Sequence, residues 1–308
     1  MKLSAISLLS ISSILMPTDV HGATLPESIF DNFVLRPIRY AKRYTVHQVS
    51  GVKAQDKFFP STNGRMLHGW YFKKANSERT VLLSHGIGGN VSSRVDLISL
   101  YLNAGTSVFI YDYQGYGRSG GNPSLKNIVE DGNAAYNYLT QDLAVKPETV
   151  ILAGESLGTG VTCALSKRVP SAGLILQSPF SSLAKRVGEV VPFLRNKADW
   201  MEPTAGLEND QVLSRPHPPV LIVHGDLDTT VPVWHAEDLY KSAIGEKQLL
   251  VIHGAGHTGD PALMQSPEYL EAVKHFLNAL PPGSPVQVSD HQDHHISASM
   301  PVGIYGSN

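Results

Sequence analysis

The sequence predicts an α/β protein built on one mostly parallel β-sheet that is covered by helices on both faces. Short runs rich in branched aliphatic residues recur along the chain, and longer segments with helical periodicity lie between them. This alternation is typical of parallel sheets, because their strands are joined by crossover helices. The expected strands are Thr80–Ser84, Ser107–Asp112, Val150–Ala153, Gly173–Gln177, Val220–His224 and Leu249–His253. The expected helices are Arg94–Asn103, Ile128–Leu143, Val161–Val169, Trp234–Ile244 and Glu268–Leu280.

Length and composition are those of a globular protein with a sizeable core. The 308 residues, 42% of them hydrophobic and 17% charged, suffice for one large α/β domain or two small ones. The formal net charge is -2 and no block of like charge occurs, so we expect no nucleic-acid partner. The one cysteine, Cys163, excludes disulfides within the chain and cysteine-based metal sites, and we expect it to be a buried apolar residue.

The first 23 residues have the pattern of an export signal. Lys2 precedes an apolar, serine-rich run that ends at Met16, and the small residues Gly22 and Ala23 follow. The run is shorter than the roughly 20 residues that span a bilayer. We therefore expect a periplasmic or secreted protein with no stable membrane span after removal of the signal. An uncleaved N-terminal membrane anchor is the alternative.

The expected domain spans residues 55–280 and follows a lead-in, residues 24–54, that has no clear pattern. It begins with an alternating hairpin in which Lys57–Phe59 and Met66–Phe72 flank a turn at Asn63-Gly64.

Residues 180–216 form an insertion that is long for a connection between two strands, which favours a lid or a binding loop. The alternative is a pair of surface helices without contact to substrate. Apolar side chains in this segment suggest an acyl pocket, with Val191, Phe193 and Leu194 as tentative substrate contacts. Residues 281–308 are rich in Pro, Ser and Gly and are expected to be a disordered tail.

The strongest functional signal is residues 150–160, VILAGESLGTG, in which Ser156 lies between two glycines. An apolar strand leads into the serine and a helical run follows it. A nucleophile elbow is built in this way, and glycine two positions on either side lets the strand and the helix approach closely. A bare Gly-x-Ser-x-Gly also arises by chance, so the interpretation needs a base and an acid elsewhere in the chain.

Two later strand ends supply these partners. Asp226 and Asp228 follow one strand, at the sheet edge where catalytic groups gather; Asp228 is the preferred acid, and Asp226 could instead cap the turn. The next strand leads into a glycine-rich loop that presents His257, whose ring can accept the Ser156 proton and donate to Asp228. His253, at the strand end, is expected to be a packed, hydrogen-bonded core histidine.

An oxyanion hole needs two backbone amides. Leu157, directly after the serine, offers one. The glycine-rich loop after Thr80–Ser84 offers the other at Ile87, and the alternative is a turn without catalytic duty. His85, in the same loop, is expected to brace it.

These motifs resemble the α/β-hydrolase superfamily, and within it the Bem46-like branch of α/β-hydrolase domain-containing proteins. The resemblance covers roughly residues 55–280. It implies an eight-stranded sheet and metal-free serine hydrolysis, with Ser156 as nucleophile, Asp228 as acid and His257 as base. The chain departs from the protein-depalmitoylating members in lacking their cysteine-rich N-terminus. The segments that carry the resemblance are HGIGGN (85–90), DYQGYGRSGG (112–121), EDGNAAYNYL (130–139), GESLGTG (154–160), HGDLDTTVP (224–232) and HGAGH (253–257).

The sequence thus predicts a serine esterase or thioesterase that cleaves a small-molecule or lipid-like acyl substrate through an acyl-enzyme, without a metal or a cofactor. A serine peptidase is the alternative enzyme, because the same core cleaves amides. A non-catalytic binding protein is the third hypothesis, although such proteins typically lose a triad residue and here all three positions are filled. Neither substrate identity nor oligomeric state follows from the sequence.

Overall fold

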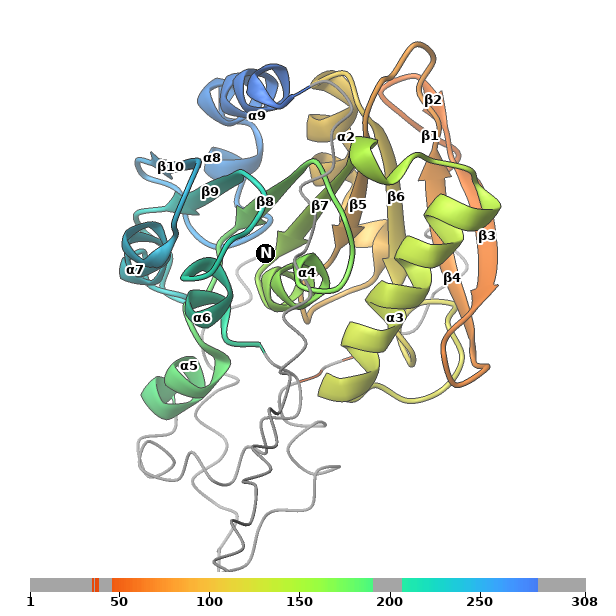
Figure 1. Cartoon of the computed structure of the whole chain (residues 1–308), viewed down its shortest axis with the longest axis horizontal. Coiled ribbons are helices and arrows are strands. Elements are labelled where there is room, and N and C mark those ends of the chain that lie inside the picture. Colours follow the sequence, from red (N-terminus) through yellow and green to blue (C-terminus); the bar gives the residue numbers. More distant parts are fainter. Residues whose placement is uncertain (1–34, 36, 39–45, 191–206, 282–308) are drawn as a thin grey trace, which may run out of the picture.

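The structure, a computed structural model, describes residues 35, 37–38, 46–190 and 207–281 (Figure 1). Its core is one eight-stranded sheet of order β10-β9-β8-β7-β5-β6-β4-β3, which confirms the predicted α/β architecture. The strands from β10 to β6 pair in parallel, and β4 and β3 complete the sheet in antiparallel pairing. The strands are β3 (Gln55–Pro60), β4 (Met66–Phe72), β5 (Thr80–Ser84), β6 (Ser107–Asp112), β7 (Val150–Glu155), β8 (Gly173–Gln177), β9 (Val220–Gly225) and β10 (Lys247–Ile252).

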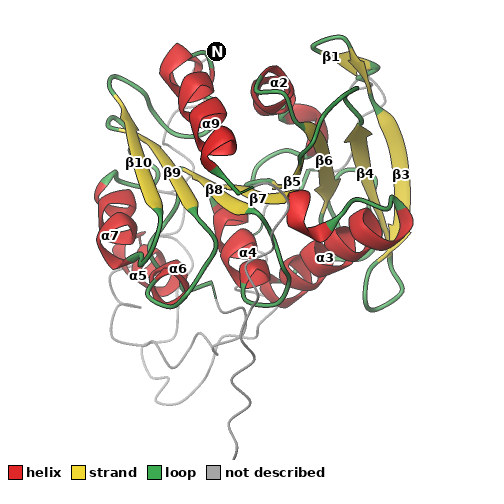
Figure 2. Ribbon diagram, turned by 45° about the horizontal axis from the view of Figure 1, so that its top comes forward, coloured by secondary structure: helices red, strands yellow, loops and turns green. Residues whose placement is uncertain are grey.

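Helices cover both faces of the sheet (Figure 2). Because successive side chains of a strand point to opposite faces, each central strand supplies two apolar layers. On β5, Leu82 belongs to one buried cluster, whereas Val81 and Leu83 belong to the other. The helices of the first cluster are α3 (Leu125–Asn137), α4 (Leu157–Ser166), α5 (Leu183–Val190), α6 (Asn209–Leu213) and α7 (Trp234–Ser242), and those of the second are α2 (Val95–Asn103), α8 (Pro261–Met264) and α9 (Pro267–Ala279).

Two helices, α3 and α4, begin three or four residues earlier than the sequence predicts. Helix α3 begins at Leu125 because the Ser124 side chain accepts a hydrogen bond from the Asn127 amide, which caps the first turn. Helix α4 begins at Leu157, immediately after Ser156, although the glycines that follow disfavour a helix. Packing against β5 and β7 therefore outweighs the low helix propensity of this segment.

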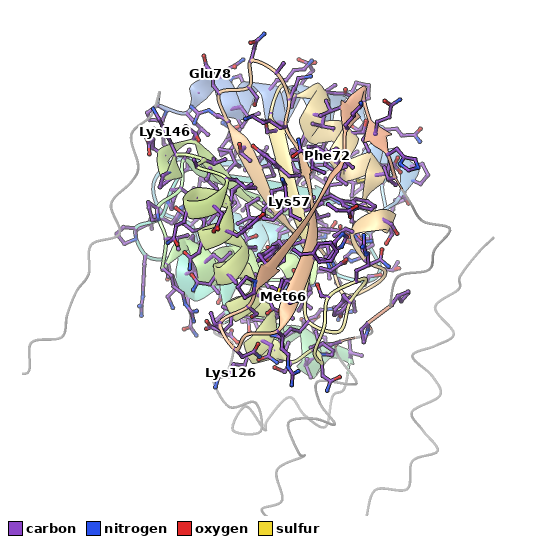
Figure 3. All side chains as sticks on the ribbon, turned by 90° about the vertical axis from the view of Figure 1, so that its right-hand side faces the viewer. Lys57, Met66, Phe72, Glu78, Lys126 and Lys146 are labelled. Atoms are coloured by element: carbon purple, nitrogen blue, oxygen red, sulfur yellow. The ribbon has the colours of Figure 1, made fainter. Side chains whose placement is uncertain are left out.

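The hairpin at the start of the domain confirms the prediction. Strands β3 and β4 pair antiparallel around a turn in which Gly64 has φ +79°. Figure 3 views this side of the sheet, where Lys57 and Met66 are labelled. The lead-in contains one further hairpin, β1 (Gln48–Val49) and β2 (Val52–Lys53), which the sequence analysis does not identify.

Several predictions concern residues that the structure does not describe. The export signal, most of the lead-in, the tail from residue 282 onward and the middle of the 180–216 insertion lie outside the described residues, so these stay predictions. Within the described part of the chain, no helix has both the length and the apolar character needed to cross a bilayer.

Candidate active site

Ser156 stands at the sharp turn between β7 and α4. Its backbone has φ +52° and ψ -117°, a conformation that non-glycine residues rarely adopt. The Ser156 amide donates to the carbonyl oxygen of Gln177 at 2.9 Å, which ties the turn to β8. A Cβ atom on Gly158 would lie 1.9 Å from the Ser84 carbonyl oxygen, and one on Gly154 would lie 2.4 Å from the Gly158 carbonyl oxygen. Glycine is therefore required on both sides of the serine.

Three side chains that are far apart in the sequence meet at this turn. The Nε2 atom of His257 lies 3.1 Å from the Oγ atom of Ser156, and its Nδ1 atom lies 2.6 Å from the Oδ2 atom of Asp228. The residues follow β7, β9 and β10, whose carboxyl ends share one edge of the parallel sheet. The His257 side chain is 19% exposed and that of Asp228 is fully buried, so the serine end of the line faces the pocket.

The carboxylate of Asp228 is held by its own loop and by a second histidine. Its Oδ1 atom accepts hydrogen bonds from the amides of Thr230 and Val231, both at 2.8 Å. Its Oδ2 atom also lies 3.2 Å from Nε2 of the buried His224. Burial alone would raise the pKa of Asp228, but hydrogen bonds from His224 and His257 and the charge of His257 outweigh burial and lower this pKa well below its ordinary value. The group is therefore a carboxylate at neutral pH.

Asp226, the alternative acid, has a different role. Its Oδ1 atom accepts from the amide of Gly254 at 2.7 Å and its Oδ2 atom lies 2.5 Å from Nδ1 of His253. The prediction that His253 packs in the core is wrong, because its side chain is 97% exposed. Strand β10 ends one residue earlier, at Ile252, and the chain then turns at Gly254, which has φ +76°. The Asp226–His253 pair thus fastens the turn at the surface.

The loop that carries Ile87 lies beside the serine. Ile87, Ser156 and His257 line the same pocket, and Leu157 is the first residue of α4. His85 is fully buried, its Nδ1 atom is 2.7 Å from the carbonyl oxygen of Gly86, and its own carbonyl oxygen accepts from the Tyr113 hydroxyl. Burial, and next the charge of Arg94, lower the pKa of His85, so the ring is neutral and contacts its loop rather than the serine. The donor roles of the Ile87 and Leu157 amides stay a prediction.

A pocket of about 350 Å³ opens over Ser156. The expected acyl-pocket residues Val191, Phe193 and Leu194 lie outside the described residues, so this wall of the site stays a prediction. The described walls are mixed in character. Their apolar side chains are Ile87, Leu97 and Met264, and their charged side chains other than His257 are Arg94, Asp96 and Glu155.

Sequence reasoning missed these three charged residues and His224. Arg94 and Asp96 lie in the expected helix Arg94–Asn103, and Glu155 is the variable position of the serine motif. No pattern in the sequence shows that their side chains turn toward one pocket.

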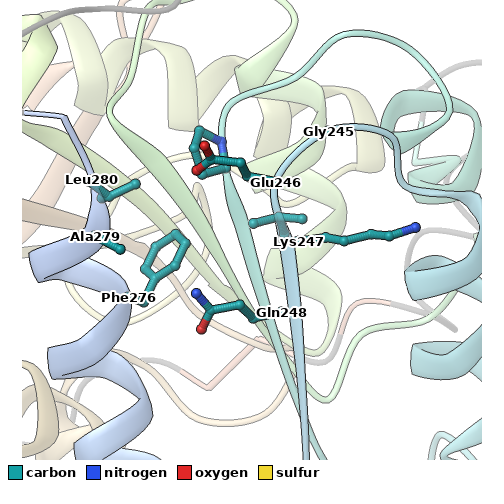
Figure 4. Close-up of a pocket in the computed structure, with 9 residues that line it drawn as sticks. Gly245, Glu246, Lys247, Gln248, Phe276, Ala279 and Leu280 are labelled. Atoms are coloured by element: carbon teal, nitrogen blue, oxygen red, sulfur yellow. The ribbon is translucent and has the colours of Figure 1, made fainter.

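A pocket of about 400 Å³ lies elsewhere, between α9 and the amino ends of β9 and β10 (Figure 4). Phe276 and Leu280 line it, together with the turns that precede β9 and β10. Figure 4 shows the Lys247 side chain pointing away from α9. It lies at the end of the sheet opposite to Ser156, because parallel strands begin there. Among the described residues that line it there is no serine, histidine or cysteine, so the pocket over Ser156 is the better candidate for a catalytic site.

The comparisons with known proteins agree with one another on the kind of protein that this chain resembles. A family model described as "Serine aminopeptidase, S33" matches residues 75–217. An uncharacterized protein of Mycobacterium tuberculosis is 34% identical over 226 residues, which are 72% of this chain and 79% of that protein. Alpha/beta hydrolase domain-containing protein 17B of Xenopus tropicalis is also 34% identical, over 66% of this chain and 67% of its own length. The solved structure of the Pyrococcus furiosus esterase PF2001 shares the fold, with a TM-score of 0.64 and 19% identity over 80% of this chain and 98% of that one.

Proposed function

The chain belongs to the α/β-hydrolase family, and from this membership we propose that it is a serine hydrolase acting on carboxylic esters or thioesters. The observation that carries the proposal is the line of contacts from the Ser156 hydroxyl through His257 to the buried carboxylate of Asp228. A hydroxyl becomes a competent nucleophile when an adjacent base can take its proton and an acid orients that base. The substrate class is a small-molecule or lipid-like acyl ester, for which the pocket over Ser156 has room.

The reaction would follow the acyl-enzyme route. Ser156 Oγ attacks the acyl carbon while His257 Nε2 takes its proton, and Asp228 stabilises the imidazolium through Nδ1–H. The oxygen of the tetrahedral intermediate accepts hydrogen bonds from the Ile87 and Leu157 amides. Collapse releases the alcohol or thiol, which receives the proton from His257. Water, activated by the same imidazole, then hydrolyses the acyl-enzyme.

The proposal predicts that Ser156→Ala lowers kcat/KM for p-nitrophenyl butyrate by several orders of magnitude, about 10⁴-fold or more. Alanine keeps the space of the side chain but has no oxygen to acylate. Labelling by a fluorophosphonate probe should disappear with the activity. Ser214→Ala is the matched control, because the Ser214 hydroxyl donates to the Gln211 carbonyl oxygen at the exposed end of α6. Full activity in Ser156→Ala would identify a different nucleophile.

A serine peptidase is the second candidate, favoured by the description of the matching family model. Comparison of kcat/KM for an aminoacyl arylamide and for an acyl ester of similar size separates the two activities. A higher value for the arylamide would replace the esterase proposal. Absence of both activities and of fluorophosphonate labelling in folded protein would favour a binding protein.

A further inference from the structure

Arg94 lies between the two parts of the structure that carry the expected oxyanion donors. Its Nε atom is 2.6 Å from Oε2 of Glu155, the residue immediately before the nucleophile. Its Nη2 atom donates to the carbonyl oxygen of Gly88 at 2.5 Å, in the loop that contains Ile87. One guanidinium group therefore joins the Ile87 loop to the nucleophile elbow.

The backbone that holds Arg94 is fixed independently of these contacts. Asn90 and Ser93 form a reciprocal cap on the short helical turn Val91–Ser93, and Arg94 is the C-cap residue of this turn. The amide of Val91 donates to the buried carboxylate of Asp112 at 2.9 Å. Because these hydrogen bonds hold the backbone next to Arg94, its side chain can hold the Gly88 loop in place.

The glycine-rich loop needs such a tie because it lies beyond the sheet. Ser84 pairs with Gly154 across β5 and β7, and it is the last residue of β5 that the sheet fixes in register, whereas Glu155 still pairs with Gln177 of β8. After Ser84 the chain enters the loop at Gly86, where a Cβ atom would lie 3.2 Å from Oε1 of Glu155. The Glu155 carboxylate therefore lies between Gly86 and the Arg94 side chain.

We propose that Arg94 is a positioning residue for the proposed hydrolysis: its contacts with Gly88 and Glu155 set the spacing between the Ile87 and Leu157 amides. This inference rests on the proposed function. The requirement is strict because a displacement of about 1 Å in a catalytic group costs roughly 100-fold in rate. Arg94 acts through the loop and not on the substrate.

The burial of the pair makes the contact specific. The side chains of Arg94 and Glu155 are 12% and 4% exposed, so removal of either partner leaves a poorly solvated charge. The planar guanidinium reaches both Glu155 and Gly88 with separate nitrogens. Lysine keeps the charge, but its three donors radiate from one nitrogen, so it does not reproduce the two contacts that Arg94 makes with separate nitrogens of a planar group.

The experiment compares Arg94→Lys and Glu155→Gln with a matched control, Arg168→Lys. Arg168 also pairs with a glutamate, Glu130, at 2.9 Å, but both side chains are substantially exposed and neither is among the residues that line the pocket. For p-nitrophenyl butyrate we expect kcat to fall about 10- to 100-fold in each test variant, with KM within about threefold of the wild type. The control should stay within about twofold.

Two further readouts exclude a merely structural effect. The affinity for a trifluoromethyl ketone, which forms an oxyanion on the serine, should fall by the same factor as kcat/KM, because only transition-state contacts are lost. The double variant should lose little more than either single variant, since both changes break one contact. An unchanged kcat, a loss confined to KM, or additive losses would overturn the proposal.

A measurement without substrate separates this proposal from the proposed function. Cleavage within residues 86–89 by proteinase K, followed by mass spectrometry, should be at least about tenfold faster in both test variants and unchanged in Arg168→Lys. Unchanged cleavage would overturn the role of Arg94 even in a protein with no esterase activity. Conversely, a wild type that neither hydrolyses esters nor takes the fluorophosphonate label would contradict the proposed function, whatever the proteolysis data show for the loop.

Discussion

Asp228 contacts two histidines, and only one of them reaches the serine. His257 contacts Oδ2 at 2.6 Å, whereas the fully buried His224 lies 3.2 Å from the same oxygen and 2.8 Å from the Val231 carbonyl oxygen. The buried His224 therefore stabilises the loop that carries Asp228, whereas His257 faces the pocket. This arrangement explains how an ionised carboxylate can remain in a buried position.

At the residue scale, we predict that Asp228→Asn lowers kcat by about 10⁴-fold. The asparagine oxygen can still accept from the Thr230 and Val231 amides, so the loop keeps its shape. The amide nitrogen, however, would face Nδ1 of His257 and favour the wrong tautomer of the ring. Ester hydrolysis at saturating substrate measures the effect.

Asp226→Asn is the matched control for this prediction. Asp226 fastens the surface turn at Gly254 through its Oδ1 atom, which asparagine also provides. Activity should stay within about threefold of the wild type. A large loss in Asp226→Asn together with near-normal activity in Asp228→Asn would reverse the assignment of the acid.

The sequence identifies residues whose chemistry shows in their local context. Ser156, Asp228 and His257 each lie in the loop that follows an apolar run, so their common sheet edge could be predicted. Arg94 could not be predicted, because its position depends on the fold of the preceding turn and on the side chain reaching back across the loop. The prediction for His253 is wrong because the strand ends one residue earlier than expected, so the ring lies in solvent and not in the core.

At the scale of the elements, the close contact between α4 and β5 defines the serine turn. Gly158→Ala would bring a methyl group within 1.9 Å of the Ser84 carbonyl oxygen, a backbone atom that cannot move aside. We predict a loss of at least about 3 kcal/mol in the free energy of unfolding. Urea denaturation followed by circular dichroism measures it.

Gly120→Ala serves as the control. A Cβ atom there meets only the Met66 carbonyl oxygen, at 3.5 Å, and the residue is not among those with positive φ. Its free energy of unfolding should change by less than about 1 kcal/mol. Equal midpoints for both variants would show that α4 can shift without cost.

For the elements that the sequence predicts, their existence is easier to predict than their ends. The hairpin follows from Asn63-Gly64 and from alternating side chains, because these act locally. The start of α4 at Leu157 depends instead on tertiary packing, which overrides the propensity of Gly158 and Gly160.

At the scale of the whole molecule, buried histidines make the fold sensitive to acid. Burial lowers the pKa of His85 and of His235, with the Glu189 carboxylate partly opposing the effect at His235. A group whose folded pKa lies below its unfolded value of 6.5 stabilises the protein above that pH and loses this contribution as the pH falls. Asp131 and Glu208 act in the opposite sense, because burial raises their pKa values.

We predict that the free energy of unfolding decreases as the pH falls below about 6.5, the pKa of an unfolded histidine, with a slope of up to about 1.4 kcal/mol per pH unit for each of these histidines. Urea denaturation at several pH values measures the slope. His235→Gln should reduce it, because one titrating ring is removed. The same slope in wild type and variant would exclude His235 as a source of the acid sensitivity.

The overall architecture could be predicted because the buried strands of a parallel sheet are continuous apolar runs. Strands β5 to β9 are buried at every position, and each was identified from such a run. The polar wall of the pocket could not be predicted. It forms where loops that follow different strands lie close together, and the sequence of any one loop does not show which other loops it contacts.

The pairing of Ser84 with Gly154 also bears on how this scaffold could diversify. Hydrogen bonds between adjacent strands hold these groups in place. The segment between β8 and β9 also touches this frame, because Asn209 of α6 donates to the Thr159 hydroxyl of α4 and Arg186 of α5 donates to the Thr230 carbonyl oxygen in the Asp228 loop. A segment grafted from a relative to alter which molecules are accepted would therefore have to keep both contacts to preserve the alignment of Ser156, His257 and Asp228.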